Sequence, residues 1–393
     1  MSKLTERIES FNEGRRPDLL KMKYEAMRRS PYRFFRGTCH LFYEDFKYQV
    51  NWPDDTRAWI CGDLHLENFG TFKAENGLIY FDMNDFDEAI LAPVTWEIAR
   101  TVTSIHLLAK KLNFNKKEIT ALVNCFIEKY TDTLTRGKAI MFERQAAQGM
   151  VEDLINRAME RKHEKLIKQR TYKKKGERKL NTDNGKALPL KKEEKQFIEG
   201  FVSYWSNLKF NDRYIFKDAA LRIAGTGSLG LRRYIILSWD TLIKEFVVLD
   251  MKEAKASSLA PHVPYQQPYW NNEAMRIVGC QEKIQYLTPA LLTAVAFQQT
   301  YFVIAALQPS EDTINFESSE INPKRFINVL ETMAIIAASG QLRSSGREGS
   351  SNTGELMNFG LHHKQWLQPL LHFSEMYADQ VQEDYEAFCK SRL

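Results

Sequence analysis

The spacing of apolar residues changes several times along the 393-residue chain, and each spacing predicts a different kind of element. In the first third, WICGDLHLENFG and GLIYFDMNDFDEA each predict a strand followed by a polar loop. From PVTWEIARTVTSIHLLAKKL onward, apolar residues recur at helical spacing, which predicts helices as far as about Glu160. Ahead of the first strand, we expect a charged helix over residues 2–16 and an aromatic-rich turn over Ser30–Thr38.

The second half of the chain also alternates between strand and helix patterns. AALRIAGTGSLGLRRYIILSW and EFVVLDMKEA predict strands around a short turn, and a helical pattern follows over Glu273–Lys283. The segment Ile284–Ser310 carries no charge and is long enough to span a membrane. Because Gln-Gln-Thr interrupts it, two buried strands around a polar turn explain it better, and we expect no membrane span. The last residues, Asn322–Leu393, are predicted to be mostly helical.

Composition narrows the class of protein. Apolar residues make up 44% of the chain and charged residues 27%, as in ordinary globular proteins. The net charge of +5 is too small to indicate nucleic-acid binding without a focused basic patch. The five cysteines lie far apart and form no CxxC pair. This spacing favours a reducing, cytoplasmic location over a disulfide framework or a zinc site.

One basic segment, residues 162–195, stands out from this ordinary composition. We expect it to be a solvated, partly disordered connection. The alternative is a patch for nucleic acid or acidic lipid, which the scarcity of aromatic side chains disfavours. The chain is then expected to have three parts: a helical part with both polar loops over 1–200, a β-rich part over 201–312, and a helical part over 313–393.

The two polar loops carry side chains whose chemistry suits phosphate transfer. Asp63 and Asn68 lie in the first loop, and Asp85 lies in the second. Such oxygen ligands suit Mg²⁺, which completes its coordination with water and substrate phosphate. A carboxylate that binds no metal can orient or deprotonate a hydroxyl. A calcium loop over Asp82–Asp87 is excluded, because Phe86 stands where a third oxygen ligand belongs and no glycine follows.

A glycine-rich stretch, GTGSLG, follows much later in the chain. Its G-x-G-x-x-G pattern and enclosed serine are formed by Gly225, Gly227, Ser228 and Gly230. A dinucleotide-binding fold needs a helix directly after the glycines and an acid about 20 residues on, a distance that Asp250 meets. The residues that follow, LRRYIILSW, instead predict a strand. Glycine loop, strand, turn, strand and then Lys252 form a kinase arrangement, in which the loop and the lysine bind phosphates.

Two stretches resemble motifs of a known enzyme group. GDLHLEN resembles the catalytic loop of the aminoglycoside phosphotransferase and choline kinase group, a branch of the protein-kinase-like fold. NDFDEAILAPVTWEIAR resembles the metal-binding stretch of that group, in which an Asp precedes the acid-aliphatic-Ala start of a helix. Here these residues are Asp85 and Glu97-Ile98-Ala99, and the spacing selects Asp85 over Asp82.

The whole chain is more closely similar to the bacterial family called domain of unknown function 2252. The pieces that carry this resemblance are SPYRFFRGT, GDLHLENFGTF, FDMNDFDEA, GTGSLG, MKEA and YADQVQEDYEAF. In kinases the glycine loop and lysine precede the catalytic and metal loops, whereas here they follow them, and ETMAIIAASGQL resembles the helix before a catalytic loop. The resemblance implies a circularly permuted, two-lobed kinase-like fold of class α+β, with a small β-rich nucleotide lobe and a larger helical lobe.

Carried over to matching positions, the resemblance implies a role for each candidate residue. Asp63 is expected to be the catalytic base or hydroxyl orienter, with His65 beside it in the catalytic loop, which it braces. Asn68 and Asp85 are expected to bind Mg²⁺, and Lys252 to contact the phosphates of ATP. The cover over these phosphates is expected to be formed by Gly225, Gly227, Ser228 and Gly230.

The chain departs from the pattern of that group at two positions. Cys61 stands where the pattern has His, and no glutamate obviously pairs with Lys252, with Glu273 and Glu282 as the candidates. For Arg36, pairing with an acid is favoured over contact with a phosphate.

The expected function is ATP- and Mg²⁺-dependent phosphorylation of a hydroxyl group on an unidentified small molecule. One alternative is a catalytically inactive pseudokinase that binds nucleotide, for which the missing helix glutamate argues. Another is nucleotidyl transfer from ATP. A dehydrogenase is the most distant alternative, and it predicts a helix after Gly230.

Overall fold

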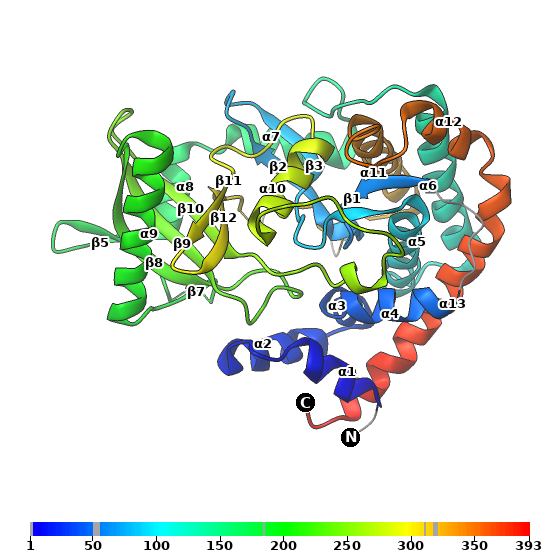
Figure 1. Ribbon diagram of the computed structural model, residues 1–393, viewed down its shortest axis with the longest axis horizontal. Coiled ribbons are helices and arrows are strands. Elements are labelled where there is room, and N and C mark those ends of the chain that lie inside the picture. Colours follow the sequence, from blue (N-terminus) through cyan, green and yellow to red (C-terminus); the bar gives the residue numbers. More distant parts are fainter. Residues whose placement is uncertain (1–2, 50–55, 184, 310–311, 317–320) are drawn as a thin grey trace.

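The protein is a mixed α and β molecule, seen in a computed structural model that describes residues 3–49, 56–183, 185–309, 312–316 and 321–393. One end is a sheet region, in which α9 lies against the strands β8 to β12, and the other is a helical region around α5, α6 and α11 (Figure 1). The helices are α1 (Lys3–Phe11), α2 (Pro17–Met27), α3 (Pro31–Gly37), α4 (Cys39–Gln49), α5 (Val94–Lys111), α6 (Lys116–Arg136), α7 (Gly149–Glu160), α8 (His163–Arg170), α9 (Lys192–Phe210), α10 (Glu273–Ile284), α11 (Pro323–Arg343), α12 (Thr353–Leu361) and α13 (Lys364–Lys390). The strands are β1 (Arg57–Ile60), β2 (Phe69–Lys73), β3 (Ile79–Met83), β4 (Ile90–Pro93), β5 (Thr171–Lys174), β6 (Glu177–Leu180), β7 (Ala187–Leu188), β8 (Tyr214–Arg222), β9 (Arg233–Asp240), β10 (Glu245–Glu253), β11 (Thr293–Phe297) and β12 (Thr300–Ala306).

The sheet region is built on six antiparallel strands in the order β11-β12-β10-β9-β8-β7. On one face, Phe201 and Trp205 of α9 share an apolar core with Leu249 of β10. On the other face, Ile167 of α8 shares a core with Leu237 of β9. Because both faces are buried, the register of the central strands is fixed, and it places the ends of β8, β9 and β10 that flank the glycine loop side by side.

The helical region surrounds α5, which is buried along nearly its whole length. α5 packs against α6 and α13, and α11 packs against α6. Two charged residues of α5, Glu97 and Arg100, are buried with the apolar ones. A buried charge is costly unless it is paired, so both side chains need partners nearby.

Two short antiparallel strand pairs hold the polar loops. β1 pairs with β4, and β2 pairs with β3, with Gly70 opposite Asp82. The first loop follows β1 and ends in a short 3-10 turn at Leu66–Asn68, and the second joins β3 to β4. The N–H of Asn84 in the second loop donates to the carbonyl of Asn68 in the first at 2.9 Å, so the two loops lie side by side.

Most of the element pattern predicted from the sequence is confirmed. β1 and β3 precede the polar loops, helices α5 to α7 continue to Glu160, and the C-terminal stretch is mostly helical. The uncharged segment forms two strands as predicted, β11 and β12, around a turn at Gln298 and Gln299, which both have positive φ. Most residues of these strands are partly exposed, so the expected burial is wrong. No helix among the described residues is long and apolar enough to cross a membrane.

The N-terminal predictions need correction. The stretch Ser30–Thr38 is not a turn, because it forms helix α3. The Ser30 side chain accepts a hydrogen bond from the N–H of Arg33, and Pro31 occupies the first turn of the helix. The charged helix ends at Phe11, before a turn that leads to α2.

The prediction for the basic segment is wrong in part. Its described residues are mostly exposed to solvent, as predicted, but they fold into α8, the hairpin β5–β6, β7 and the start of α9 instead of a disordered connection. The two-residue turn of the hairpin has Lys175 and Gly176 at positive φ, the backbone that such a turn requires.

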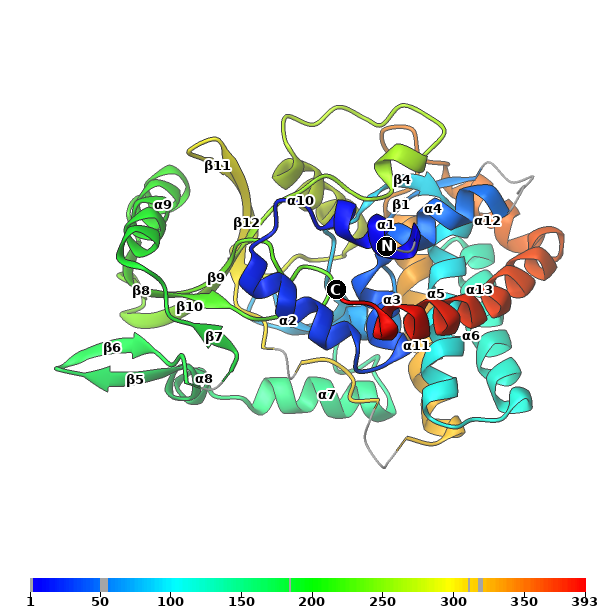
Figure 2. The same cartoon turned by 90° about the horizontal axis from the view of Figure 1, so that it is seen from below.

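The N-terminal segment crosses from the helical region to the sheet region (Figure 2). Leu19 of α2 joins the apolar core that α9 forms on the sheet. The C-terminus lies beside the same segment, where the Arg28 side chain donates to the carbonyl of Leu393. Tyr385 of α13 donates to the Arg28 carbonyl at 2.8 Å.

Candidate functional site

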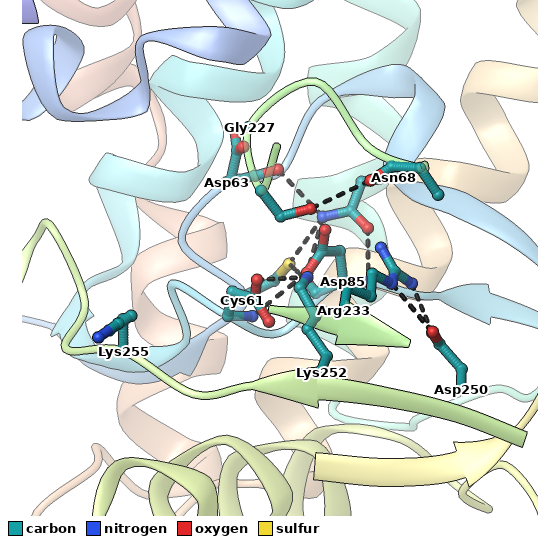
Figure 3. Close-up of polar contacts among 12 residues, drawn as sticks. Cys61, Asp63, Asn68, Asp85, Gly227, Arg233, Asp250, Lys252 and Lys255 are labelled. Atoms are coloured by element: carbon teal, nitrogen blue, oxygen red, sulfur yellow. Dashed lines mark hydrogen bonds and ion pairs between the residues drawn. The ribbon is translucent and has the colours of Figure 1, made fainter. Parts of the chain in front are cut away.

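Asn68 joins the two polar loops (Figure 3). Its Oδ1 accepts a hydrogen bond from the Asp85 N–H at 2.7 Å, and its Nδ2 lies 3.0 Å from the Asp63 carbonyl and 3.1 Å from the Asp85 carbonyl. Nδ2 also lies 3.2 Å from the sulfur of Cys61. The buried amide therefore acts as a brace between the loops, which differs from the role of metal ligand that the resemblance implies.

Cys61 belongs to the same brace. Its thiol donates to the Asp85 carbonyl at 2.8 Å, and burial raises the pKa of the thiol well above its ordinary value. The thiol therefore stays protonated and serves as a hydrogen-bonding group at the position where the kinase-like pattern has a histidine. The five cysteines of the chain are free thiols.

Asp63 is held by Arg100 of α5. The Arg100 Nε and Nη2 lie 2.7 and 2.6 Å from Asp63 Oδ1, and Nη2 also donates to the Phe35 carbonyl at 3.2 Å. Arg100 is fully buried, whereas the Asp63 side chain keeps 20% of its surface exposed. One carboxylate oxygen is thus fixed from inside the helical region while the group still faces an open space.

Glu97 of α5 supports the backbone of the first loop. Its carboxylate accepts hydrogen bonds from the Cys61 N–H at 2.6 Å and from Gln341 Nε2 at 3.0 Å. Burial raises the pKa of Glu97 to about 7, although these two hydrogen bonds favour the ionised form. This acid therefore orients the backbone of the loop from a site without solvent, where it does not reach the cavities described below.

His65 is a support for the loop as well. It is buried, and its Nε2 accepts a hydrogen bond from Arg36 Nε at 3.2 Å. Burial and the Arg36 charge lower the pKa of His65 well below its ordinary value, so the ring is neutral. Arg36 also forms an ion pair with Glu67, which confirms the expected pairing of Arg36 with an acid.

Lys252 of β10 reaches the second loop from the sheet region. Its Nζ lies 3.3 Å from Asp85 Oδ1 and also pairs with Asp87 (Figure 3). Desolvation by the surrounding loop opposes ionisation of Asp85, although half of its side chain is exposed, but Lys252 and Arg233 hold its pKa below the ordinary value. Burial and the charge of Asp85 raise the pKa of Asp87. Two carboxylates thus share one ammonium group, and the pair keeps an excess of negative charge.

Neither candidate glutamate of α10 pairs with Lys252. Glu273 pairs with Arg276 of the same helix at 2.5 Å, and Glu282 is exposed. The α10 residues that line the same cavity as Lys252 are Ile277 and Gln281, and both are uncharged. Lys252 is therefore paired with two acids of the second polar loop and with neither glutamate.

The sheet presents two further cations beside Lys252, which sequence reasoning missed. Arg233 lies directly opposite Lys252 in the register of β9 and β10, and Arg222 ends β8 on the other side of the glycine loop. Asp250 accepts from both arginines, at 2.5 Å from Arg222 and 2.6 Å from Arg233, and their charges hold its pKa well below the ordinary value. Like charges on neighbouring strands are unfavourable without a counterion, and Asp250 is the common counterion of the two arginines.

The glycine stretch forms a loop between β8 and β9, as its residues predict. Gly225 and Gly230 have positive φ, and the Ser228 hydroxyl donates to the Ala224 carbonyl at 3.3 Å. A strand rather than a helix follows the loop, and Asp250 is occupied by two arginines. Both observations contradict the dehydrogenase alternative.

Two cavities meet at the second polar loop. The larger has a volume of about 630 Å³ and the smaller about 360 Å³, and both are lined by Arg36, Asp85 and Asp87. Asp63 lines the larger cavity and Lys252 the smaller one. The glycine loop divides them, since Gly225 lines the smaller cavity whereas the larger is lined by Gly227, Ser228 and Gly230.

Comparison with protein families gave one match. The family described as "Uncharacterized protein conserved in bacteria (DUF2252)" matches residues 15–391. The chain belongs to this family. Neither curated proteins nor solved structures gave a match. The resemblance to the bacterial family of domain of unknown function 2252 is therefore confirmed over nearly the whole chain.

Some residues of the site carried a weak signal in the sequence. Arg100 follows Ile98 and Ala99 in a helix pattern with many apolar residues, and a charge in such a stretch indicates a buried partner. Arg222 and Arg233 flank the glycine stretch at the ends of two strand patterns. Their common counterion, Asp250, could not be found without the register of three strands.

Proposed function

We propose that the protein is an ATP- and Mg²⁺-dependent phosphotransferase with a kinase-like fold that phosphorylates a hydroxyl group of a small molecule. The observation that carries this proposal is the contact between Lys252 and Asp85, which lie 167 residues apart in the chain. It joins the lysine of the sheet to the acidic loop at the junction of two cavities. A transferase needs room for a donor and an acceptor that meet at one point.

A circular permutation of the kinase-like fold accounts for the order of the elements. A sheet with a glycine loop and a lysine follows the acidic loops in sequence yet stands against them in space (Figures 1 and 3). In kinases the glycine loop and the lysine precede the catalytic and metal loops, so the reversed order in this chain supports a permutation.

The residues at the junction fit a magnesium ion. Asp85 keeps 51% of its side chain exposed, and Asp85 and Asp87 share the ion pair with Lys252. Among the described residues, there is no group of three or more His, Cys, Asp or Glu side chains that could hold a metal ion. Two carboxylates with phosphate and water as the other ligands are typical of Mg²⁺ bound with a nucleotide. The ion would neutralise charge on the phosphates.

The other residues divide between donor and acceptor. Lys252, Arg222 and Arg233 line the smaller cavity together with their partner acids Asp85, Asp87 and Asp250. We assign the three cations to the phosphates of the donor. Asp63 faces the larger cavity, where it orients the acceptor hydroxyl and accepts its proton. Arg100 fixes the position of that carboxylate, and Asn68 fixes the distance between the two loops.

One observation favours a second candidate function, a pseudokinase that binds nucleotide without turnover. Lys252 pairs with Asp85 and Asp87 and with neither glutamate of α10. In an active kinase, a helix glutamate positions this lysine and leaves the metal-binding Asp for the ion.

The experiment that separates these functions follows the fate of ATP. The full chain is incubated with Mg²⁺, ATP and fractions of a bacterial metabolite extract, and products are identified by mass spectrometry. The proposal predicts ADP and a phosphorylated acceptor, and neither with Asp63→Asn. Pyrophosphate and a nucleotidylated acceptor would indicate nucleotidyl transfer. Binding of ATP without any product in all fractions would support the pseudokinase.

A further inference from the structure

The N-terminal segment contacts the glycine loop through its carbonyl groups. Arg15 Nη1 lies 2.8 Å from the carbonyl oxygens of both Gly227 and Leu229. The N–H of Arg16 donates to the carbonyl of Gly230 at 3.1 Å. These partners lie more than 200 residues apart in the chain, with a separation of 212 between Arg15 and Gly227.

A buried lysine adds to this contact. Lys23 of α2 has no exposed surface, and its Nζ donates to the Gly227 carbonyl at 3.1 Å and to Asn12 Oδ1 at 2.8 Å. Arg15 and Lys23 also lie over the ring of Phe11, at 5.2 and 5.6 Å from its centre. In the hydrogen bonds described for this part of the chain, both cations contact oxygens without formal charge.

Such an arrangement is unfavourable for folding alone. A buried cation that is hydrogen-bonded to neutral oxygens loses its hydration, and carbonyl and amide oxygens replace only part of it. The charge of Glu88 offsets part of this cost for both side chains, although Glu88 is not among their described hydrogen-bond partners. Burial accordingly lowers the pKa of Lys23 well below its ordinary value and also lowers that of Arg15. An anion on the other side of the loop would offset this cost, because it would favour the charged form of both side chains.

The glycines fit this contact closely. A Cβ atom at Gly230 would lie 2.8 Å from the Cβ of Arg15, and φ at Gly230 is +99°. A Cβ atom at Gly227 would lie 3.2 Å from the carbonyl of Arg36. The second and third glycines therefore let the loop approach the N-terminal part of the chain. In a trans peptide, the N–H points opposite to the preceding carbonyl, so the N–H groups of Ser228 and Gly230 point away from Arg15.

We infer that Arg15 and Lys23 are positioning residues for the donor phosphates. They hold the glycine loop by its carbonyls, so that its N–H groups face away from the N-terminal segment, and they add positive charge behind it. This inference rests on the proposed function, because the anion is the polyphosphate of the donor. The N-terminal segment is then part of the nucleotide site although it lies outside the sheet region.

The test compares the affinities of ATP and adenosine by isothermal titration calorimetry, with Mg²⁺ present. Lys23→Met removes the charge and keeps the length, and Arg15→Met is the second variant in case Lys23→Met does not fold. Lys21→Met, on the exposed side of the same helix, is the control. We expect ATP affinity to fall about tenfold in both variants, with adenosine affinity and that of the control unchanged.

Equal losses for ATP and adenosine, or unchanged ATP affinity in a folded variant, would overturn the inference and leave the proposed function intact. A wild-type chain that binds no nucleotide would overturn both. The two failures are therefore distinguishable in one experiment.

Discussion

Asp63 and Asp85 lie in neighbouring loops that Asn68 joins, yet each carboxylate is fixed from a different part of the molecule. Asp63 is held by Arg100, a buried residue of its own helical region. Asp85 is held by Lys252, which comes from the sheet region. The pair of Asp63 and Arg100 keeps its geometry if the helical and sheet regions move relative to each other. The pair of Asp85 and Lys252 forms only while the two regions are in contact. Asp63 therefore suits a fixed part in chemistry, and Asp85 suits a ligand whose partner changes when the donor binds.

The largest effect that we expect comes from Asp63→Asn. Removing the carboxylate that faces the acceptor should lower the transfer rate by about 10²- to 10⁴-fold. Affinity for Mg²⁺ and ATP should stay the same, because Asp63 lines the larger cavity. Steady-state rates and calorimetric titration of the same preparation measure both. Loss of ATP binding in this variant would mean that the two carboxylates do not have separate roles.

A smaller effect is expected from Lys252→Met. Without the ammonium, Asp85 and Asp87 repel each other and the donor phosphates lose a cation, so ATP affinity should fall about 10- to 100-fold. Lys217→Met on the exposed side of β8 is the matched control and should bind ATP normally. Calorimetry provides the comparison. Equal affinity in Lys252→Met and the control would show that this lysine does not contact the phosphates.

The smallest effect that we expect is a pH dependence of the free energy of unfolding, caused by Glu97, which accepts a hydrogen bond from the backbone of the first loop. The pKa of Glu97 is raised to about 7 in the folded protein, above its value in the unfolded chain, so folding takes up a proton at neutral pH. The free energy of unfolding should therefore fall by about 2 kcal/mol as pH rises from about 5 to 8. Asp82, with a pKa raised to about 6, acts in the same direction.

Glu97→Gln tests this expectation. Urea unfolding across this pH range should show a weaker decrease than in the wild type, with the remaining slope due to Asp82 and other groups. A slope identical to that of the wild type would show that Glu97 is ionised throughout the range.

The sequence predicts strands and helices well where the apolar pattern is long. It predicts them poorly where the structure depends on a few residues at a helix start or a turn. The uncharged segment could be assigned to β11 and β12 because Gln298 and Gln299 mark the turn. Helix α3 was missed although Ser30 and Pro31 form a regular helix start. The hairpin β5–β6 could not be anticipated, because Lys175 at its turn is an unusual residue for positive φ.

The candidate site was only partly accessible from the sequence. Asp85 and Lys252 could be named from motif spacing, and they do meet in space. Their partners could not be named, because contact between residues of distant segments depends on how the regions pack. Arg100 and Lys23 carry buried charges whose role is visible only when Asp63 and the glycine loop are seen beside them.

The most direct test of the account is calorimetric titration of ATP into the full chain, with and without Mg²⁺, in the wild type and in Asp85→Asn. Asp153→Asn on the exposed side of α7 is the control. The account predicts that the wild type and the control bind ATP and that Mg²⁺ tightens this binding, whereas Asp85→Asn loses the effect of Mg²⁺. A folded wild type that binds no ATP, or an Asp85→Asn variant that keeps the full effect of Mg²⁺, would contradict it.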